Sequence, residues 1–192
     1  DVLINNAGGG HFDAAEFLGH EKMEALFQTL VFSHMELCRV ALAVMSARGS
    51  GKIINVTSLA SRMPVPFMSA YNSAKAAMAS YTFSLQIELA NRRVQIIDVQ
   101  PADIRTNFNN AVARAPTNDP RIEKTWEVVD HNMQHAPPPD LVARQILKLI
   151  ATNNPPPRVT VGDFFQSRFA PLIFRFLPQR TRVWGLRKYY KF

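Results

Sequence analysis

The stretch GKIINVTSLASRMPVPFMSAYNSAK, residues 51–75, joins a short apolar strand to an alanine-rich helix through a loop. β-branched side chains dominate residues 52–57, so a strand is predicted there. Pro64 and Pro66 interrupt the chain after it, and residues 70–90 then show the apolar spacing of a helix. A strand followed by a long helix is half of a parallel β-α-β unit, which favours an α/β fold.

The rest of the chain continues this alternation of strands and helices. The further elements are predicted in this order: a strand over 2–6, a helix over 21–47, a strand over 93–99, a helix around 120–133, a helix over 141–151 and a strand over 158–161. Gly49 is expected to end the helix over 21–47, and Pro101 is expected to end the strand over 93–99. Asp140 is expected to cap the helix over 141–151. Because parallel crossovers are right-handed, this order predicts a doubly wound parallel sheet with helices on both faces.

Three loops with distinctive residues follow the predicted strands. A glycine-rich turn follows the first strand, Ser58 follows the second, and the segment 101–106 follows the third. Ligands of open α/β sheets bind beyond the carboxyl ends of the strands. We therefore expect the three loops to meet at one crevice that holds the functional site.

The charge of the chain is concentrated near its C-terminus. The chain has 192 residues and a net charge of +7. Residues 158–192 hold eight Lys or Arg and one acid, whereas residues 1–157 balance 14 basic against 14 acidic side chains. A basic surface over the whole domain would indicate nucleic-acid binding, and this neutral body argues against it.

Cysteine content and hydropathy restrict the compartment. A single cysteine, Cys38, excludes an internal disulfide framework, and it fits a core residue of a protein in the reducing cytoplasm. No uninterrupted apolar run reaches the roughly 20 residues that span a bilayer. The first residues, Asp1 to Ile4, are more typical of the interior of a domain than of a natural start or a signal peptide.

Tyr71 and Lys75 lie four residues apart, which places both on one face of the predicted helix. A phenol with a pKa of ~10 is a poor base at neutral pH, and a neighbouring ammonium group lowers that pKa. Such a phenol exchanges a proton with an alcohol or ketone, and Ser58 would hold the same oxygen. Hydride transfer would need a cofactor, because no side chain supplies a hydride. Taken alone, a Tyr–Lys pair also arises by chance, and a lone serine is more typical of a helix or turn cap.

Four motifs, in their order and spacing, resemble the short-chain dehydrogenase/reductase family. They are Asn5-Asn6-Ala7-Gly8, Ser58 within Asn55-Val56-Thr57-Ser58, Tyr71-Asn72-Ser73-Ala74-Lys75, and the segment Val99 to Thr106. The resemblance implies a Rossmann-like, dinucleotide-binding domain, represented here by the last four strands of its sheet. It divides the chain into a catalytic part, residues 1–162, and a basic aromatic tail, residues 163–192.

The resemblance implies an oxidoreductase that moves a hydride between NAD or NADP and a carbonyl or alcohol substrate. Tyr71 would be the general acid/base, Lys75 would lower its pKa and hold the nicotinamide ribose, and Ser58 would position the substrate oxygen. Further cofactor contacts are implied for Asn5, Ala7, Gly8, Pro101, Ile104 and Thr106. No metal site is expected, although His131 and His135 are four residues apart.

Three departures from the family pattern bear on activity. The chain begins about where the family's fourth strand would begin, so the glycine-rich pyrophosphate turn and the segment that selects NAD or NADP are absent from it. We expect residues 1–192 in isolation to be inactive and, through an open sheet edge, poorly soluble. Leu30 stands where the family often has an asparagine for a proton relay, and Ala102 stands where a glycine commonly follows the proline. A non-catalytic relative that binds a ligand or partner is therefore the alternative hypothesis.

Residues 103–135 are expected to form a lid over the crevice, and Phe108 and Trp126 to make an apolar substrate pocket. The resemblance implies a homo-oligomer with the helices 21–47 and 70–90 at the subunit contact. The tail has three open interpretations: peripheral contact with an anionic membrane, a cover over the pocket or subunit contact, or packing on the domain with its cations in water. A protein whose main role is assembly or membrane contact through this tail is the third hypothesis.

Overall fold

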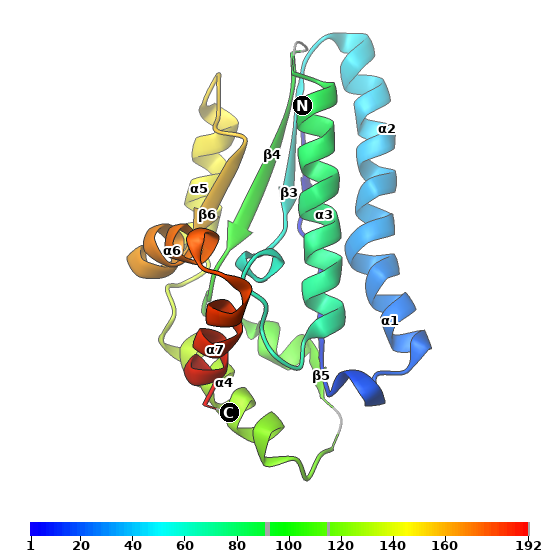
Figure 1. Cartoon of the computed structure of the whole chain (residues 1–192). Coiled ribbons are helices and arrows are strands. Elements are labelled where there is room, and N and C mark those ends of the chain that lie inside the picture. Colours follow the sequence, from blue (N-terminus) through cyan, green and yellow to red (C-terminus); the bar gives the residue numbers. More distant parts are fainter. Residues whose placement is uncertain (91–92, 115, 192) are drawn as a thin grey trace.

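The core of the molecule is a sheet of four parallel strands (Figure 1). This computed structural model describes residues 1–90, 93–114 and 116–191; Asn91, Arg92, Ala115 and Phe192, which fall in the predicted catalytic part, lid and tail, lie outside the described residues. The strands lie in the order β1 (Val2–Asn5), β3 (Gly51–Val56), β4 (Val94–Pro101) and β6 (Arg158–Val161). The predicted α/β class, the four strands and their parallel arrangement are confirmed.

One long helix runs along the outside of the molecule. It consists of α1 (His20–Phe27), a π-helical turn (Gln28–Phe32) and α2 (Ser33–Arg48). The helix ends at Gly49, which has a φ of 77° in the left-handed region. Glycine adopts this φ without the strain that a side chain would introduce, so the predicted end of the helix is confirmed.

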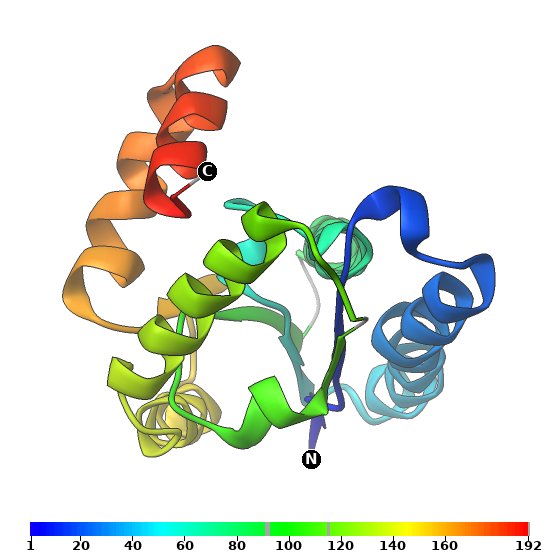
Figure 2. The ribbon, with the colours of Figure 1, turned by 90° about the horizontal axis from the view of Figure 1, so that it is seen from below.

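The two faces of the sheet are covered by different helices (Figure 2). α3 (Ser69–Glu88) lies with α2 on one face, and α5 (Asp140–Ala151) lies on the other. Ile53 of β3 packs against apolar side chains of α2 and α3, whereas Ile54 packs with Leu149 of α5. Successive side chains of a strand point to opposite faces, so the continuous apolar run of β3 reflects burial on both faces.

Several elements were not predicted from the sequence. β2 (Gly10–Phe12) and β5 (Val112–Arg114) pair in parallel as a second, two-stranded sheet. The tail folds into a π-helical turn (Phe165–Phe169), α6 (Ala170–Phe176) and α7 (Gln179–Tyr189). Strands of three residues are too short to show a periodic pattern, and this explains why β2 and β5 were missed.

Two predicted boundaries are wrong. Asp140 is the first residue of α5, and Pro139 occupies the cap position without a side-chain cap hydrogen bond. β4 extends two residues beyond the predicted bound at residue 99 and ends at Pro101, which pairs with Val161, because the missing N–H of a proline is tolerated at the end of a strand. The side-chain cap lies instead at α4 (Pro120–His135), where Asp119 accepts a hydrogen bond from the backbone of Arg121.

The continuous helix His20–Arg48 is long and apolar enough, by length and composition alone, to cross a membrane. This corrects the prediction that no segment is long enough: its uninterrupted apolar runs are short, yet an 18-residue window has a mean hydropathy of 1.4. The same helix packs on the sheet through Cys38 and Met45. A helix in the core of a folded domain passes the same test, so the finding is weak evidence for a membrane span.

Ala102 and Gly162 meet where β4 and β6 end. Ala102 N donates a hydrogen bond to Val161 O at 2.7 Å, and a Cβ added at Gly162 would lie 2.6 Å from the Cβ of Ala102. The methyl group of Ala102, a departure from the family pattern, is therefore accommodated by the glycine across from it.

Replacing Gly162 by Ala is expected to lower the free energy of unfolding by about 1–3 kcal/mol, because two methyl groups would occupy nearly the same space. The variant Ala102→Gly/Gly162→Ala removes the clash and is expected to recover most of that loss. Chemical denaturation of both single variants and the double variant measures the coupling. Additive effects of the two substitutions would contradict the contact.

The two outer strands of the main sheet have different surroundings. β1 pairs with β3 among the described residues, and its Val2 and Ile4 are 40% and 42% exposed. β6 lies at the opposite edge and leads into the tail. An open apolar strand edge invites further strand pairing, which is the physical basis for the predicted poor solubility of residues 1–192 in isolation.

Candidate active site

A cavity of about 1560 Å³ lies beyond the carboxyl ends of the parallel strands. Figure 2 shows the ribbons of α4 and the tail at this end of the molecule. The three strand-end loops that were predicted to meet all contribute to its wall, through Gly8, Ser58 and Pro101. The remaining wall comes from α3, α4, α5 and the tail. One crevice at the strand ends therefore collects most of the predicted site residues, as expected for an open parallel sheet.

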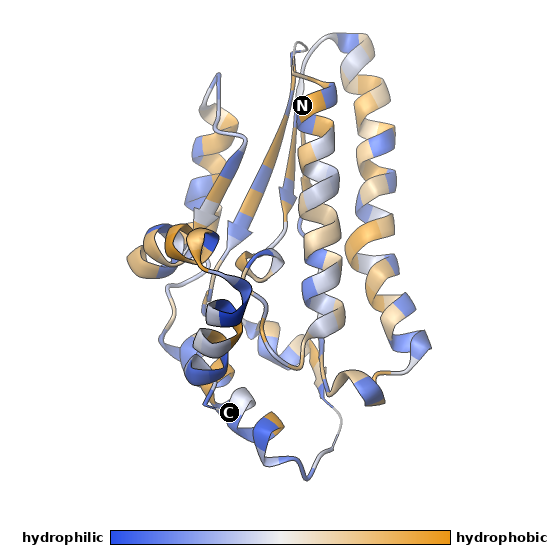
Figure 3. Ribbon diagram, viewed as in Figure 1, coloured by the Kyte–Doolittle hydropathy of each residue, from blue (hydrophilic) through white to orange (hydrophobic). Residues whose placement is uncertain are grey.

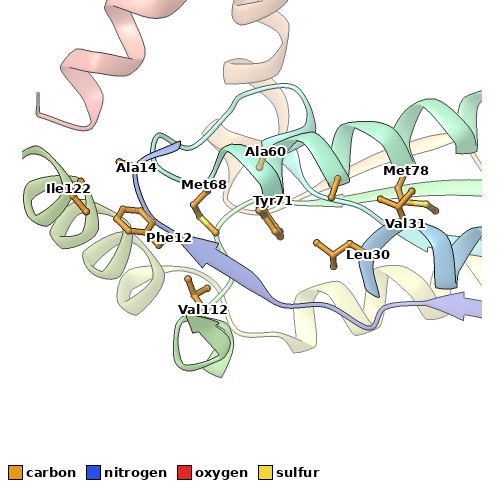
Figure 4. Packing of buried hydrophobic residues seen from close by; sticks show 11 residues of the cluster. Phe12, Ala14, Leu30, Val31, Ala60, Met68, Tyr71, Met78, Val112 and Ile122 are labelled. Atoms are coloured by element: carbon orange, nitrogen blue, oxygen red, sulfur yellow. The ribbon is translucent and has the colours of Figure 1, made fainter. Parts of the chain in front are cut away.

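Tyr71 lies in the first turn of α3 and borders the cavity. Its ring packs against Phe108 with the ring centroids 5.6 Å apart, and the side chain is 9% exposed. Figure 4 shows the ring in an apolar cluster together with Leu30 and Met68. Ser58 is close enough to the hydroxyl group to act on it, because its side chain lowers the pKa of the phenol.

Ser58 and Lys75 complete a three-residue cluster with Tyr71. Ser58 Oγ accepts a hydrogen bond from Ala60 N at 3.1 Å and so caps the 3-10 turn that follows β3. Lys75 Nζ donates to Val56 O at 2.9 Å and lies 5.9 Å from the centroid of the Tyr71 ring. The structure brings the three predicted residues together, and Ser58 is a cap as well as a neighbour of the phenol.

Burial dominates the proton affinities of the two ionisable groups. It raises the pKa of the Tyr71 phenol, and the hydrogen bond with Ser58 acts in the opposite direction. It also lowers the pKa of Lys75 to about 8, against the attraction of the Asp98 carboxylate. The expected lowering of the Tyr71 pKa by Lys75 is therefore not found, because removal of the phenol from water has the larger effect. A phenol that keeps its proton is suited to act as an acid toward a carbonyl oxygen.

Five of the six further residues predicted to contact a cofactor line the cavity: Ala7, Gly8, Pro101, Ile104 and Thr106. Their side chains are small or of moderate size. The hydroxyl group of Thr106 already has one partner within the protein, because its Oγ1 accepts a hydrogen bond from Phe108 N at 3.2 Å.

Asn5 is the exception. Its side chain is 2% exposed, and its Nδ2 donates to Asn55 Oδ1 at 2.8 Å and to Cys38 Sγ at 3.2 Å. These bonds tie the end of β1 to β3 and α2. Asn6, which was not predicted, lines the cavity instead. The alternation of side chains along a strand is the signal that would have identified it.

The residues present fit the nicotinamide end of a dinucleotide. Among the described residues, Lys75 Nζ has Val56 O as its one hydrogen-bond acceptor, so the ammonium keeps further N–H donors for sugar hydroxyls. The volume of about 1560 Å³ exceeds the ~300–1,000 Å³ of an ordinary small-molecule pocket, which leaves room for a cofactor part and a substrate together.

Leu30 occupies the π-helical turn between α1 and α2, where the resemblance expects an asparagine. It is fully buried and packs in the same cluster as Tyr71. His34, one turn later, is also buried, and its Nε2 has no hydrogen-bond partner among the described residues. Burial lowers the pKa of His34, and the charge of Lys75 lowers it further. Sequence reasoning missed this neutral imidazole, because a histidine at a core position of a helix looks like a packing residue.

The remainder of the cavity is mostly apolar. Phe108 and Trp126 line it, as predicted, and they come from the segment expected to form the lid. The tail adds residues that the sequence did not single out, among them Phe174, Leu186 and Tyr190. Of the three interpretations of the tail, a cover over the pocket is therefore found.

A few polar groups lie on the side of the cavity that the tail covers. Gln166 Nε2 donates to Asp103 Oδ2 at 2.6 Å, and burial raises the pKa of Asp103. The rings of His131 and His135 are 4.2 Å apart, and His135 Nδ1 is engaged with His131 O at 2.8 Å. These groups give the apolar pocket a small number of places where a polar substrate group can bind.

Comparisons with known proteins place the chain among similar sequences and structures. The family model of the short chain dehydrogenases matches residues 1–117. The 3-ketodihydrosphingosine reductase of Bacteroides thetaiotaomicron is 29% identical to the chain, over 99% of the chain and 72% of that protein. Retinol dehydrogenase 8 of Bos taurus is 29% identical, over 90% of the chain and 58% of that protein. The chain spans 61% and 45% of the lengths of two further curated relatives that it matches.

Solved structures show the same fold. The crystal structure of a short-chain dehydrogenase from Streptomyces avermitilis superposes with a TM-score of 0.77 at 26% identity, over 98% of this chain and 66% of that one. Other similar structures contain NADP+, NADH or NAD, and at identities below 25% they show the fold alone.

Proposed function

Because the chain belongs to the short-chain dehydrogenase family, we propose that it forms the catalytic part of an oxidoreductase that interconverts a carbonyl and an alcohol with NAD or NADP. The observation that carries the proposal is the cluster of Ser58, Tyr71 and Lys75 in one cavity at the strand ends. It combines a proton donor, a hydroxyl group that orients an oxygen, and a cation with spare N–H donors.

In the reducing direction, the Tyr71 phenol gives its proton to the carbonyl oxygen while the carbonyl carbon accepts a hydride. Ser58 donates a hydrogen bond to the same oxygen and fixes its position. Lys75 stabilises the phenolate that remains and binds the ribose hydroxyls. The bound nicotinamide supplies the hydride. The proposed contacts with the nicotinamide end of the cofactor are made by Ala7, Gly8, Pro101, Ile104 and Thr106.

The substrate is proposed to be an apolar aldehyde, ketone or alcohol. Phe108, Trp126 and Phe174 give the far part of the cavity an apolar surface. The names of two relatives, a 3-ketodihydrosphingosine reductase and a retinol dehydrogenase, support this class.

A series of aldehydes of increasing chain length tests the proposal in the intact protein that carries this chain. We expect consumption of NADH or NADPH, with kcat/KM rising up to about fourfold for each added CH₂, because each buried CH₂ contributes about 0.8 kcal/mol. The loss of NADH or NADPH fluorescence follows the reaction. The highest kcat/KM for the shortest, most hydrophilic aldehyde would contradict an apolar pocket, and no consumption with any carbonyl or alcohol would contradict the enzyme.

A non-catalytic binding protein is the second candidate function. Leu30 favours it, since a buried leucine cannot hold a water molecule for a proton relay. A protein of this kind would bind NAD or NADP without consuming NADH or NADPH in the presence of a carbonyl compound.

We also propose a homo-oligomer that forms through the long helices. Figure 3 shows apolar residues along the length of α2, and the exposed large apolar side chains of α2 and α3 include Leu37, Val40, Val44, Phe83 and Ile87. A patch of this kind on two neighbouring helices is typical of a subunit contact. Cys38 is free and buried, which supports the proposed cytoplasmic location.

A further inference from the structure

Within the tail, residues 165–189 form a helical hairpin (Figures 2 and 3), and its side chains divide into two faces. Its inner face lines the cavity, through side chains at helical spacing: Gln166, Ala170, Phe174, Leu177, Leu186 and Tyr189. Its outer face carries large apolar side chains that are between 46% and 76% exposed: Phe164, Phe169, Leu172, Phe176, Val183 and Trp184. The hairpin therefore covers the substrate pocket and presents a second apolar surface to solvent.

The two helices of the hairpin are joined by a fixed turn. Arg182 Nε donates to Leu177 O at 2.8 Å, and Arg182 Nη2 donates to Arg175 O at 2.9 Å. The same guanidinium lies 5.1 Å from the centroid of the Phe174 ring. These contacts hold α6 and α7 together, so the outer face is formed before any partner binds.

The segment that carries the outer face has charges of one sign beyond Asp163. Residues 164–191 contain seven Lys or Arg and no Asp or Glu. Arg180 and Lys188 border a second hollow of about 550 Å³, together with Val183 and Trp184 of the outer face. Cations and exposed aromatic rings thus alternate on one surface of the molecule.

We propose that the outer face docks on a bilayer that contains anionic phospholipids. Aromatic and aliphatic side chains bury their apolar parts at the boundary of headgroups and acyl chains, and lysines and arginines beside them bind the phosphate groups. The negative potential of such a surface attracts a cluster of cations. The outer face offers both kinds of interaction on one preformed hairpin.

Two other occupants fit the surface less well. A second copy of the chain would bring together two faces of the same positive charge, which repel each other. A chain segment that pairs with the open edge of β1 would not reach the outer face. β1 and β6 are the opposite edges of the sheet, and the tail follows β6.

The docking surface also adjoins the mouth of the pocket. Phe165, Ile173 and Tyr189 line the cavity and are at the same time 49–61% exposed. A lipid-soluble carbonyl or alcohol would then pass from the bilayer into the cavity at the margin of the docked face. This path rests on the proposed function, whereas docking itself does not.

Vesicle sedimentation of the intact protein, without cofactor or substrate, tests docking separately from catalysis. We expect binding to vesicles of phosphatidylcholine with phosphatidylserine to exceed binding to pure phosphatidylcholine at least tenfold, and to weaken as salt rises. Phe176→Ser/Trp184→Ser and, separately, Arg180→Gln/Lys188→Gln are each expected to weaken binding at least tenfold. Phe17→Ser is the matched control, because Phe17 is 72% exposed but lies outside the tail, and its binding should equal that of the unmodified protein.

Circular dichroism of each variant establishes that it is folded before its binding is compared. Equal sedimentation of the folded outer-face variants and the unmodified protein would overturn the proposal. Binding to polyglutamate but not to anionic vesicles would also overturn it, in favour of an acidic protein partner. A protein that binds vesicles but consumes no NADH or NADPH would support docking and contradict the proposed function, so the two failures are distinguishable.

Discussion

Replacing Tyr71 by Phe is expected to lower kcat about 10²–10⁴-fold while the fold and the affinity for NAD or NADP stay nearly unchanged. The substitution removes the hydroxyl that gives its proton to the carbonyl oxygen. The ring keeps its place, because the packing against Phe108 at 5.6 Å does not involve the hydroxyl. Steady-state kinetics, cofactor titration and thermal unfolding of the intact protein measure the three properties.

Tyr81→Phe is the matched control for this experiment. Tyr81 lies on the same helix, its hydroxyl donates to Met35 O at 3.5 Å, and it does not line the cavity. Its substitution should leave kcat unchanged. If the Tyr71→Phe variant had the same kcat as the control, the phenol would not be the acid. The protein would then use another proton donor or be a non-catalytic binding protein.

The substitution Lys75→Met is expected to lower kcat/KM about 10²–10³-fold, a loss typical of removing one preorganised charged donor from an active site. The ammonium stabilises the phenolate of Tyr71 and offers donors to the ribose. In the unmodified protein, kcat/KM is expected to fall as pH rises through about 8, where Lys75 loses its proton. The variant should lack this decrease.

The same variant should be more stable than the unmodified protein near neutral pH. The pKa of Lys75 is about 8 in the folded protein against 10.5 as its ordinary value, so the unfolded chain binds more protons between these two pH values. The stability of the unmodified protein therefore rises with pH in this window, and the full cost of the buried ammonium applies below it. That cost is about 3 kcal/mol at most, and Lys75→Met removes it.

Denaturation with urea across the range from pH 7 to pH 10 checks the effect on stability. Lys22→Met, on the exposed side of α1, is the control and should follow the unmodified protein at every pH. The account would be contradicted if Lys75→Met had the same free energy of unfolding as the unmodified protein at pH 7 and the same increase with pH. Burial of the ammonium group would then not destabilise the folded protein.

The elements of the main sheet could be predicted because their signals are local. The buried strands show as continuous apolar runs, and Gly49 ends its helix through a φ that the residue type itself indicates. The second sheet could not be predicted, because β2 and β5 are short and pair over about 100 residues of chain. The π-helical turn at Leu30 was missed since one added residue per turn hardly changes the spacing of apolar side chains.

For the site, the sequence indicated which residues lie together but not how deeply they lie. The spacing of Tyr71 and Lys75 predicted a shared helix face, and both border one cavity. The direction of the Tyr71 pKa was wrong because the degree of burial depends on residues far along the chain, such as Phe108. The motif predicted Asn5 in the cofactor site. The side chain of Asn5, at the end of β1, points instead into the core of the protein.

The claim that this cavity is a hydride-transfer site has a direct chemical test. The intact protein is incubated with an apolar aldehyde and NADH or NADPH that carries deuterium at both positions of the nicotinamide C4, and the alcohol formed is examined by mass spectrometry. We predict one deuterium on the carbinol carbon of the product, and none above background with Tyr71→Phe in the same time. Failure of the unmodified protein to form any labelled alcohol from a range of carbonyl compounds would contradict the account.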